Sequence, residues 1–119
     1  MAKVFKGIKD QITLKVEAEF MDDYGKIDND EIELTFKKIN NIDEVRKLFA
    51  DIESGERDEL ETVKEHLVSW KIEYDDGTPV ELNEETLSEI WGLLAYRNAI
   101  VQGFAKVQLG YNALAAKNS

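Results

Sequence analysis

The sequence predicts an α+β fold: a small N-terminal antiparallel sheet of about three to four strands packs with helices, and a long helix or helix pair follows. Two N-terminal stretches alternate apolar and polar residues, the period of a half-buried strand. After Ile39 the apolar spacing becomes helical. With 119 residues, 43% of them hydrophobic, the chain is predicted to form one domain. We divide it into a hairpin region (1–40), two short helices (41–68), a strand and turn (69–82) and a C-terminal helical segment (83–118).

The hairpin region contains the two alternating stretches. Residues 12–20 place apolar side chains at every second position, and residues 32–36 do the same, so the two strands are expected to pair antiparallel. The polar, turn-rich residues 21–30 between them are expected to form a loop. Val4 to Ile8 is expected to form a short edge strand, with Gly7 as a turn or bulge.

This loop partly matches a calcium-binding EF-hand. Phe20 and Tyr24 would occupy the first and fifth places of the motif, where calcium requires ligand oxygens. A solvated hairpin loop is therefore the expected structure, although four residues do fall at the third, sixth, eighth and twelfth places of the motif: Asp22, Gly25, Ile27 and Glu31.

Two short helices are expected next. Asn41, with Glu44 three residues later, is a typical capping pair, and Gly55 is a typical left-handed stop. A second helix is expected to begin near Asp58. His66, the only histidine, lacks a nucleophile or metal partner in the sequence, so we interpret it as a surface or half-buried helix residue.

Residues 70–74 alternate again and predict a further strand, which Asp76 and Gly77 end with a turn. Pro79 has no amide hydrogen for a sheet, so the returning segment is expected to be an edge or an extended stretch without full pairing. Asn83 is expected to cap the helical segment that follows.

The C-terminal segment carries an apolar stripe wider than one small domain normally covers, so we expect a partner to pack on it. A second apolar row lies beside this stripe and includes Trp91 and Leu94. The opposing interpretation is that the stripe belongs to the core of the same chain. The predicted partner-binding residues, at heptad spacing, are Leu93, Arg97, Ile100, Phe104, Val107, Tyr111 and Leu114.

Glycines interrupt this segment. Gly103 and Gly110 lie seven residues apart on one side, where small residues let a second backbone approach closely. Alternatively, Gly92 or Gly103 divides the segment into two helices that fold back on one another. Both alternatives imply a close contact.

Charge indicates a protein that works by binding. Residues 43–89 contain sixteen Asp or Glu and five Lys or Arg, and the net charge is −10. A pI near 4.6 argues against binding duplex nucleic acid, and no apolar run reaches the ~20 residues of a membrane span. We expect no catalytic residues, metal site or cofactor, because nucleophile–base sets, metal-ligand spacing and phosphate-binding glycine loops are absent from the sequence.

The order of these parts resembles the tail assembly chaperones of long-tailed bacteriophages. The shared layout covers most of the chain: a strand pair closing on Phe36-Lys37-Lys38-Ile39, a short helix ending in Ser54-Gly55, Trp70 before an Asp75-Asp76-Gly77-Thr78-Pro79-Val80 turn, a capped helix with Leu87, and a final helix ending Lys117-Asn118.

The resemblance implies a non-enzymatic protein in the cytoplasm of the host bacterium. Such a protein would bind the apolar helical tape measure protein, keep it soluble and help recruit tail tube subunits. The wide apolar helix would also suit a homo-oligomer. A different hypothesis is an acidic phage-encoded inhibitor or DNA mimic, which would need the carboxylates of residues 53–65 to line one surface at phosphate-like spacing.

Overall fold

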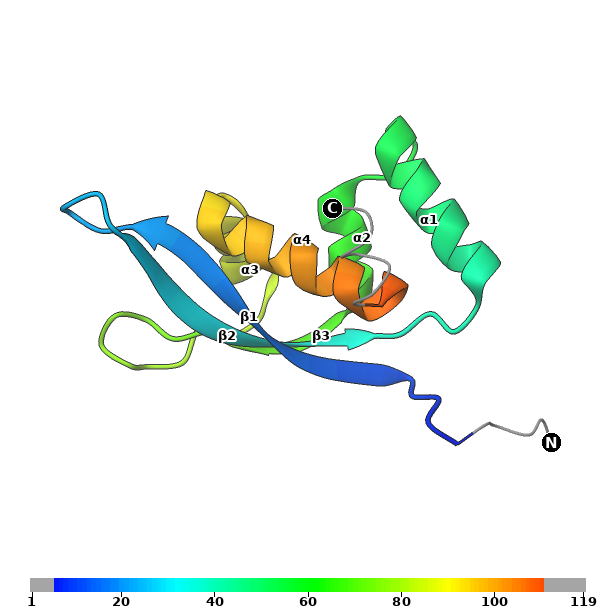
Figure 1. Cartoon of the computed structure of the whole chain (residues 1–119), viewed down its shortest axis with the longest axis horizontal. Helices are drawn as coiled ribbons and strands as arrows, with labels where there is room; N and C mark the ends of the chain where they lie inside the picture. The colour runs from blue at the N-terminus through cyan, green and yellow to red at the C-terminus, as the bar shows by residue number, and fades with distance from the viewer. Residues whose placement is uncertain (1–5, 111–119) are drawn as a thin grey trace.

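The computed structural model describes residues 6–110 and has the predicted α+β architecture. A three-stranded antiparallel sheet, in the order β1-β2-β3, carries helices on one face (Figure 1). Its buried apolar side chains form one cluster. The elements are β1 (Gln11–Met21), β2 (Ile27–Lys37), α1 (Ile42–Ser54), α2 (Glu59–His66), β3 (Leu67–Lys71), α3 (Glu84–Trp91) and α4 (Leu94–Leu109).

Strands β1 and β2 form a long hairpin whose ladder runs without a bulge from Gln11↔Lys37 to Met21↔Ile27. Both strands extend further than the sequence predicted, because the turn needs only residues 22–26. In that turn the Asp22 side chain accepts hydrogen bonds from the backbone N–H groups of Tyr24 (2.8 Å) and Lys26 (3.0 Å). Pairing therefore continues through residues that we had assigned to the loop.

The expected edge strand at Val4–Ile8 lies partly outside the described residues. Within the described part, residues 6–8 form no strand, and Gly7 occupies a turn with φ 97°. Three strands are therefore present in the described part of the chain.

Both short helices begin where their N-caps predicted, and α1 also ends at the predicted Gly55. Asn41 accepts from the Glu44 N–H (3.0 Å), and Gly55 ends α1 in the left-handed conformation with φ 84°. Asp58 caps α2 by accepting from the Glu61 N–H (3.0 Å). Each cap satisfies an amide that the first helical turn leaves unpaired.

Strand β3 has the same length as the predicted 70–74 strand but lies three residues earlier, because its ladder with β2 begins at Leu67 and ends at Lys71. Beyond it the chain turns back with few contacts, among them a hydrogen bond from Val80 N to Ile72 O (2.8 Å) and an isolated bridge between Glu73 and Pro79. Trp70 fixes this returning segment, since its indole N–H donates to the Val80 carbonyl at 2.8 Å. The predicted incomplete pairing at Pro79 is confirmed.

The C-terminal segment is a helix pair, one of the two predicted alternatives. Helix α3 begins with a capping box between Asn83 and Thr86 and ends at Gly92. Gly103 does not break α4, and Gly110 is not inside a helix as we had expected: it ends α4 with φ 84°. The break therefore falls at Gly92–Leu93.

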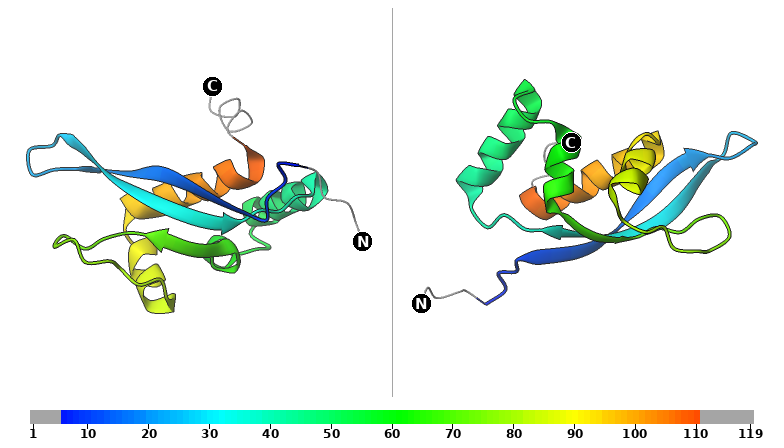
Figure 2. Two further views of the ribbon diagram at one scale, coloured as in Figure 1. Left: turned by 90° about the horizontal axis from the view of Figure 1, so that it is seen from below. Right: turned by 180° about the vertical axis from the view of Figure 1, so that it is seen from behind.

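Helix α4 lies along the inner face of the hairpin, as Figures 1 and 2 show from three sides. The close approach expected at Gly103 is present, but the neighbour is the chain's own sheet. A Cβ built on Gly103 would lie 3.0 Å from Leu34 Cδ1 and 3.4 Å from Val16 Cγ1. Among residues 6–110, no helix is long and apolar enough to cross a bilayer.

Candidate binding surface

Three of the five described residues of the predicted partner-binding stripe belong to the core, and that part of the prediction is corrected. Ile100, Phe104 and Val107 are 0%, 3% and 4% exposed, because they cover the apolar inner face of the sheet. In this fold a partner has no access to them. Tyr111 and Leu114 lie outside the described residues.

Phe104 shows how firmly the stripe is held. Its ring meets Phe36 edge-on at 5.6 Å between centroids, and Phe49 and His66 lie at 5.7 Å and 5.5 Å. It thus joins β2, α1 and α2 to α4. His66 is half-buried, and its Nδ1 pairs with the Thr62 carbonyl at 2.8 Å, which suits a packing role.

Leu93 and Arg97 of the predicted stripe do reach the surface, at the junction of α3 and α4. Leu93 is 52% exposed, and Leu94 beside it, which is not part of the stripe, is 70% exposed. Arg97 lies over the Trp91 ring (5.2 Å from the guanidinium carbon to the centroid) and pairs with Glu59 at 3.3 Å. We call Leu93 and Leu94 the elbow.

A second exposed apolar group lies at the end of the β1–β2 hairpin. Met21, Tyr24 and Ile27 are 73%, 90% and 71% exposed, and we call them the hairpin tip. Met21 and Ile27 are paired directly across the ladder, so their side chains share one face. The tip projects beyond the helices (Figure 1), since the hairpin is longer than the part of it that α4 covers.

The sequence contained a signal for the tip that we had not used. Apolar residues stand at both ends of the turn, at Met21 and Ile27, but the surrounding Asp, Asn and Gly residues led us to assign 21–30 to a solvated loop. Apolar side chains flanking a short polar turn are typical of a hairpin whose strands continue to that turn.

A groove of about 530 Å³ lies at the base of the tip, between the hairpin, the 72–80 turn and the start of α4. The Tyr96 hydroxyl donates to Asp30 Oδ2 at 2.6 Å and so ties α4 to β2. Burial first, and then the bond to Asp30, raises the pKa of Tyr96 to about 12. The groove is lined by three aromatic rings and three carboxylates: Phe20, Tyr74, Tyr96, Asp30, Glu73 and Asp75.

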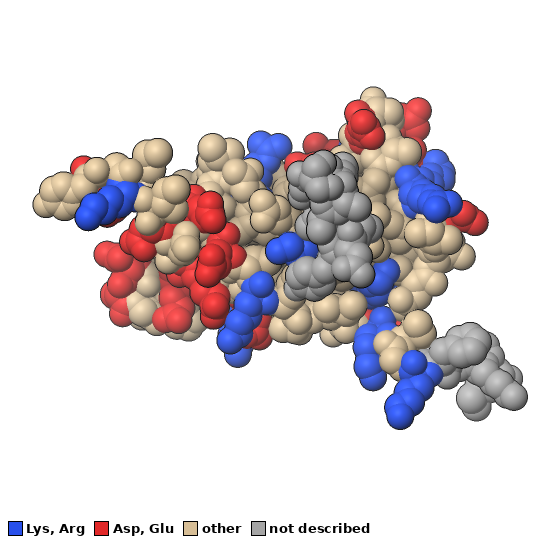
Figure 3. Space-filling model, in the orientation of Figure 1, with Lys and Arg blue, Asp and Glu red and all other residues tan. Residues whose placement is uncertain are grey.

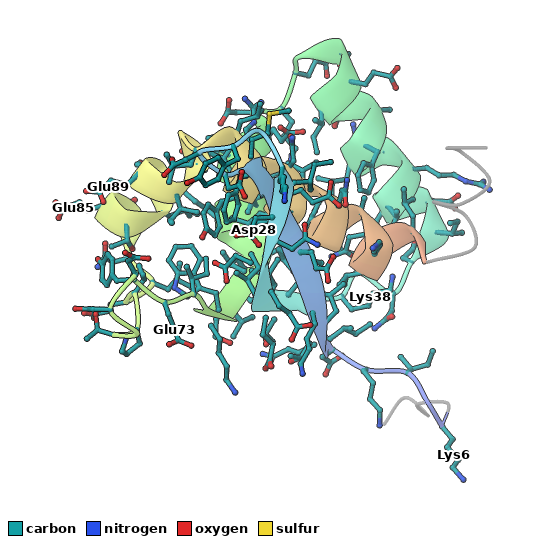
Figure 4. All side chains as sticks on the ribbon, turned by 60° about the vertical axis from the view of Figure 1, so that its left-hand side comes forward. Lys6, Asp28, Lys38, Glu73, Glu85 and Glu89 are labelled. Carbon is teal, nitrogen blue, oxygen red and sulfur yellow. The ribbon has the colours of Figure 1, made fainter. Side chains whose placement is uncertain are left out.

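The surface near this groove is acidic. Figure 3 shows Asp and Glu gathered below the projecting hairpin, whereas Lys and Arg lie mainly at the lower right of this face, with further Asp and Glu over α1 above them. In Figure 4 Glu73, Glu85 and Glu89 lie on one side of the molecule and Lys6 lies on the far side. The side of the molecule that holds Glu73, Glu85 and Glu89 is therefore acidic, and Lys6 lies away from it.

The structure also bears on the metal and mimic hypotheses. Among the described residues, no group of three or more His, Cys, Asp or Glu side chains could hold a metal ion. Of the carboxylates in residues 53–65 that the mimic hypothesis needs, three are engaged in ion pairs: Glu65 with Arg57 (3.2 Å), Glu61 with Lys64 (3.3 Å) and Glu59 with Arg97 (3.3 Å). Such pairing lowers the negative potential that a phosphate mimic requires.

Comparison with protein-family models, with curated proteins and with solved structures found no match to this chain. The fold and its surfaces therefore define its class as an α+β protein with two exposed apolar groups on an acidic body.

Proposed function

We propose that this chain is a non-enzymatic tail assembly chaperone of a long-tailed phage. It works in the cytoplasm of the host bacterium, where it binds the tape measure protein, keeps it soluble and helps recruit tail tube subunits. The layout described from the sequence suggests the family, and the exposed apolar hairpin tip is the observation that carries the proposal physically.

The tip suits reversible capture of an apolar helix. Three large apolar side chains are more than 70% exposed on an element that projects from the body (Figure 1). Large apolar side chains grouped in this way mark interaction sites more often than scattered single ones do. The elbow adds Leu93 and Leu94 as a second apolar contact.

The acidic body supports the same role. A net charge of −10 repels other copies of the complex and opposes aggregation while apolar helices are held. The apolar tip supplies the attraction, and the charge supplies the solubility.

The test is co-expression with a tape measure protein from the same genome as this chain. Replacing Met21, Tyr24 and Ile27 together with Ser should weaken binding about a hundredfold, because the loss of an anchor side chain typically costs more than 1 kcal/mol and three are lost. The soluble fraction of tape measure protein should fall accordingly. Leu93→Ser with Leu94→Ser tests the elbow in the same assay.

Ile42→Ser is the matched control. Ile42 is 59% exposed but lies on α1, away from the tip and the elbow. It should leave binding unchanged, and circular dichroism should show all variants folded. Full binding by the folded tip and elbow variants would reject the proposal.

A further inference from the structure

A basic, partly apolar arm, residues 3–9, precedes the sheet in the sequence, and its described residues, 6–9, lie at the end opposite the groove. Residues 3–9 contain three lysines and no carboxylate. In the described part, Lys6 and Lys9 flank Ile8, which is 47% exposed. Figure 4 shows Lys6 at the extremity of the molecule. The full arm is Lys3, Val4, Phe5, Lys6, Gly7, Ile8 and Lys9.

The groove has the complementary character. Phe20 and Tyr74 are 39% and 53% exposed, so their rings are available to a ligand. Asp30, Glu73 and Asp75 form no ion pair with a Lys or Arg of the described residues. The ion pairs of the described residues involve carboxylates outside the groove. Lysine ammonium groups bind both to carboxylates and over aromatic rings.

The arm cannot reach the groove of its own chain. From Gln11 to Phe20 the strand rises about 30 Å, at roughly 3.3 Å per residue. Residues 3–9 fully extended span only about 20 Å and start at the wrong end of this strand. Any contact between the arm and a groove must therefore join two molecules.

We propose that the groove of one subunit binds the basic arm of a second copy of this chain. The lysines would face the groove carboxylates, while the apolar arm residues would contact the rings of Phe20 and Tyr74. The two surfaces differ, so the contact is head-to-tail and extends into a ring or a filament. An arm this short buries less than a standard interface, so assembly should be weak and dependent on concentration.

Charge exchange tests this contact by sedimentation velocity over a range of concentrations. Lys6→Glu with Lys9→Glu should abolish self-association, and Glu73→Lys with Asp75→Lys should do the same. When the two variants are mixed, the reversed arm meets the reversed groove and the native arm meets the native groove, so association should return. Raising the salt concentration should weaken assembly of the unaltered chain.

Arg46→Glu with Lys47→Glu is the matched control, because it makes the same charge change on α1, outside both surfaces. It should assemble as the unaltered chain does. A chain that stays monomeric at all concentrations would overturn the proposal, and so would reversed variants that still associate alone.

Cysteine cross-linking fixes the geometry, since the chain has no cysteine of its own. Lys6→Cys mixed with Tyr74→Cys should form a disulfide-linked pair under mild oxidation. Predominant linkage of either variant to itself would instead indicate a symmetric dimer and reject the head-to-tail contact. Neither outcome depends on tape measure binding, so failure here leaves the proposed chaperone function to its own test.

Discussion

Gly103 of α4 lies directly against Leu34 of β2, and a Cβ at Gly103 would come within 3.0 Å of Leu34 Cδ1. Leu34 is fully buried, as is Phe36, whose ring would lie 3.5 Å from the same Cβ. The glycine therefore lets the helix descend onto the sheet, and the contact buries the stripe that we had expected to meet a partner.

Gly103→Ala should destabilise the protein by about 1 kcal/mol. Alanine favours the helix by about 1 kcal/mol, but inserting a methyl group into a packed core costs roughly 1–3 kcal/mol, and enclosed Leu34 has little room to move. Urea unfolding measures the difference. Gln102→Ala, one residue away on the exposed side, should change stability by less than about 0.5 kcal/mol. If Gly103→Ala instead increases the free energy of unfolding, the space between Gly103 and Leu34 accommodates a methyl group without strain.

Gln108→Ala should be more costly, by about 2–4 kcal/mol. Gln108 is 4% exposed and joins α4 to the exit of β2: its side chain accepts from Ile39 N–H (2.9 Å) and donates to the Lys37 carbonyl (2.7 Å). Removing it leaves two backbone groups without these partners, at roughly 1–3 kcal/mol each. Thermal and urea unfolding check the value against Gln102→Ala. A loss below 1 kcal/mol would mean that water replaces both bonds.

Local signals in the sequence predicted much of the fold. Strand alternation needs only neighbouring residues, and so do the caps at Asn41 and Asp58, whose side chains accept from amides three residues away. These features formed where expected. A break at Gly92 was one of the two predicted alternatives, because an unbroken helix over residues 83–118 would be unusually long.

The candidate site was harder to predict, because an apolar stripe looks the same whether it covers the chain's own sheet or a partner. Ile100 and Phe104 became core because α4 packs on the apolar face of the three-stranded sheet. The hairpin tip is exposed because the hairpin extends beyond the end of α4, and the extent of this overhang is a property of the tertiary structure. The 90% exposure of Tyr24 could not be predicted from any pattern in the neighbouring sequence.

Trp70→Phe should loosen the 72–80 turn. The substitution removes the hydrogen bond from the indole to Val80 O (2.8 Å) and part of a buried ring, which should cost about 2 kcal/mol. Hydrogen exchange should quicken at Tyr74 N–H, whose bond to Thr78 O closes the turn. Trp91→Phe, at a half-buried position, is the control and should leave that amide protected. Unchanged exchange in Trp70→Phe would show that the turn holds without this bond.

The bond from Tyr96 to Asp30 should make stability depend on alkaline pH. Burial and the Asp30 carboxylate raise the pKa of Tyr96 from 10.0 to about 12, so the folded state retains a proton that the unfolded state loses. The stabilising contribution is therefore complete below pH 10 and declines as the pH rises toward 12. Tyr96→Phe lacks this ionisation, so its deficit in unfolding free energy relative to the unaltered chain should shrink over that range. Ultraviolet titration should show a late-ionising component that Tyr96→Phe removes. If this deficit stays constant from pH 9 to 12, folding does not raise the pKa of Tyr96, and the hydrogen bond to Asp30 is not formed in solution.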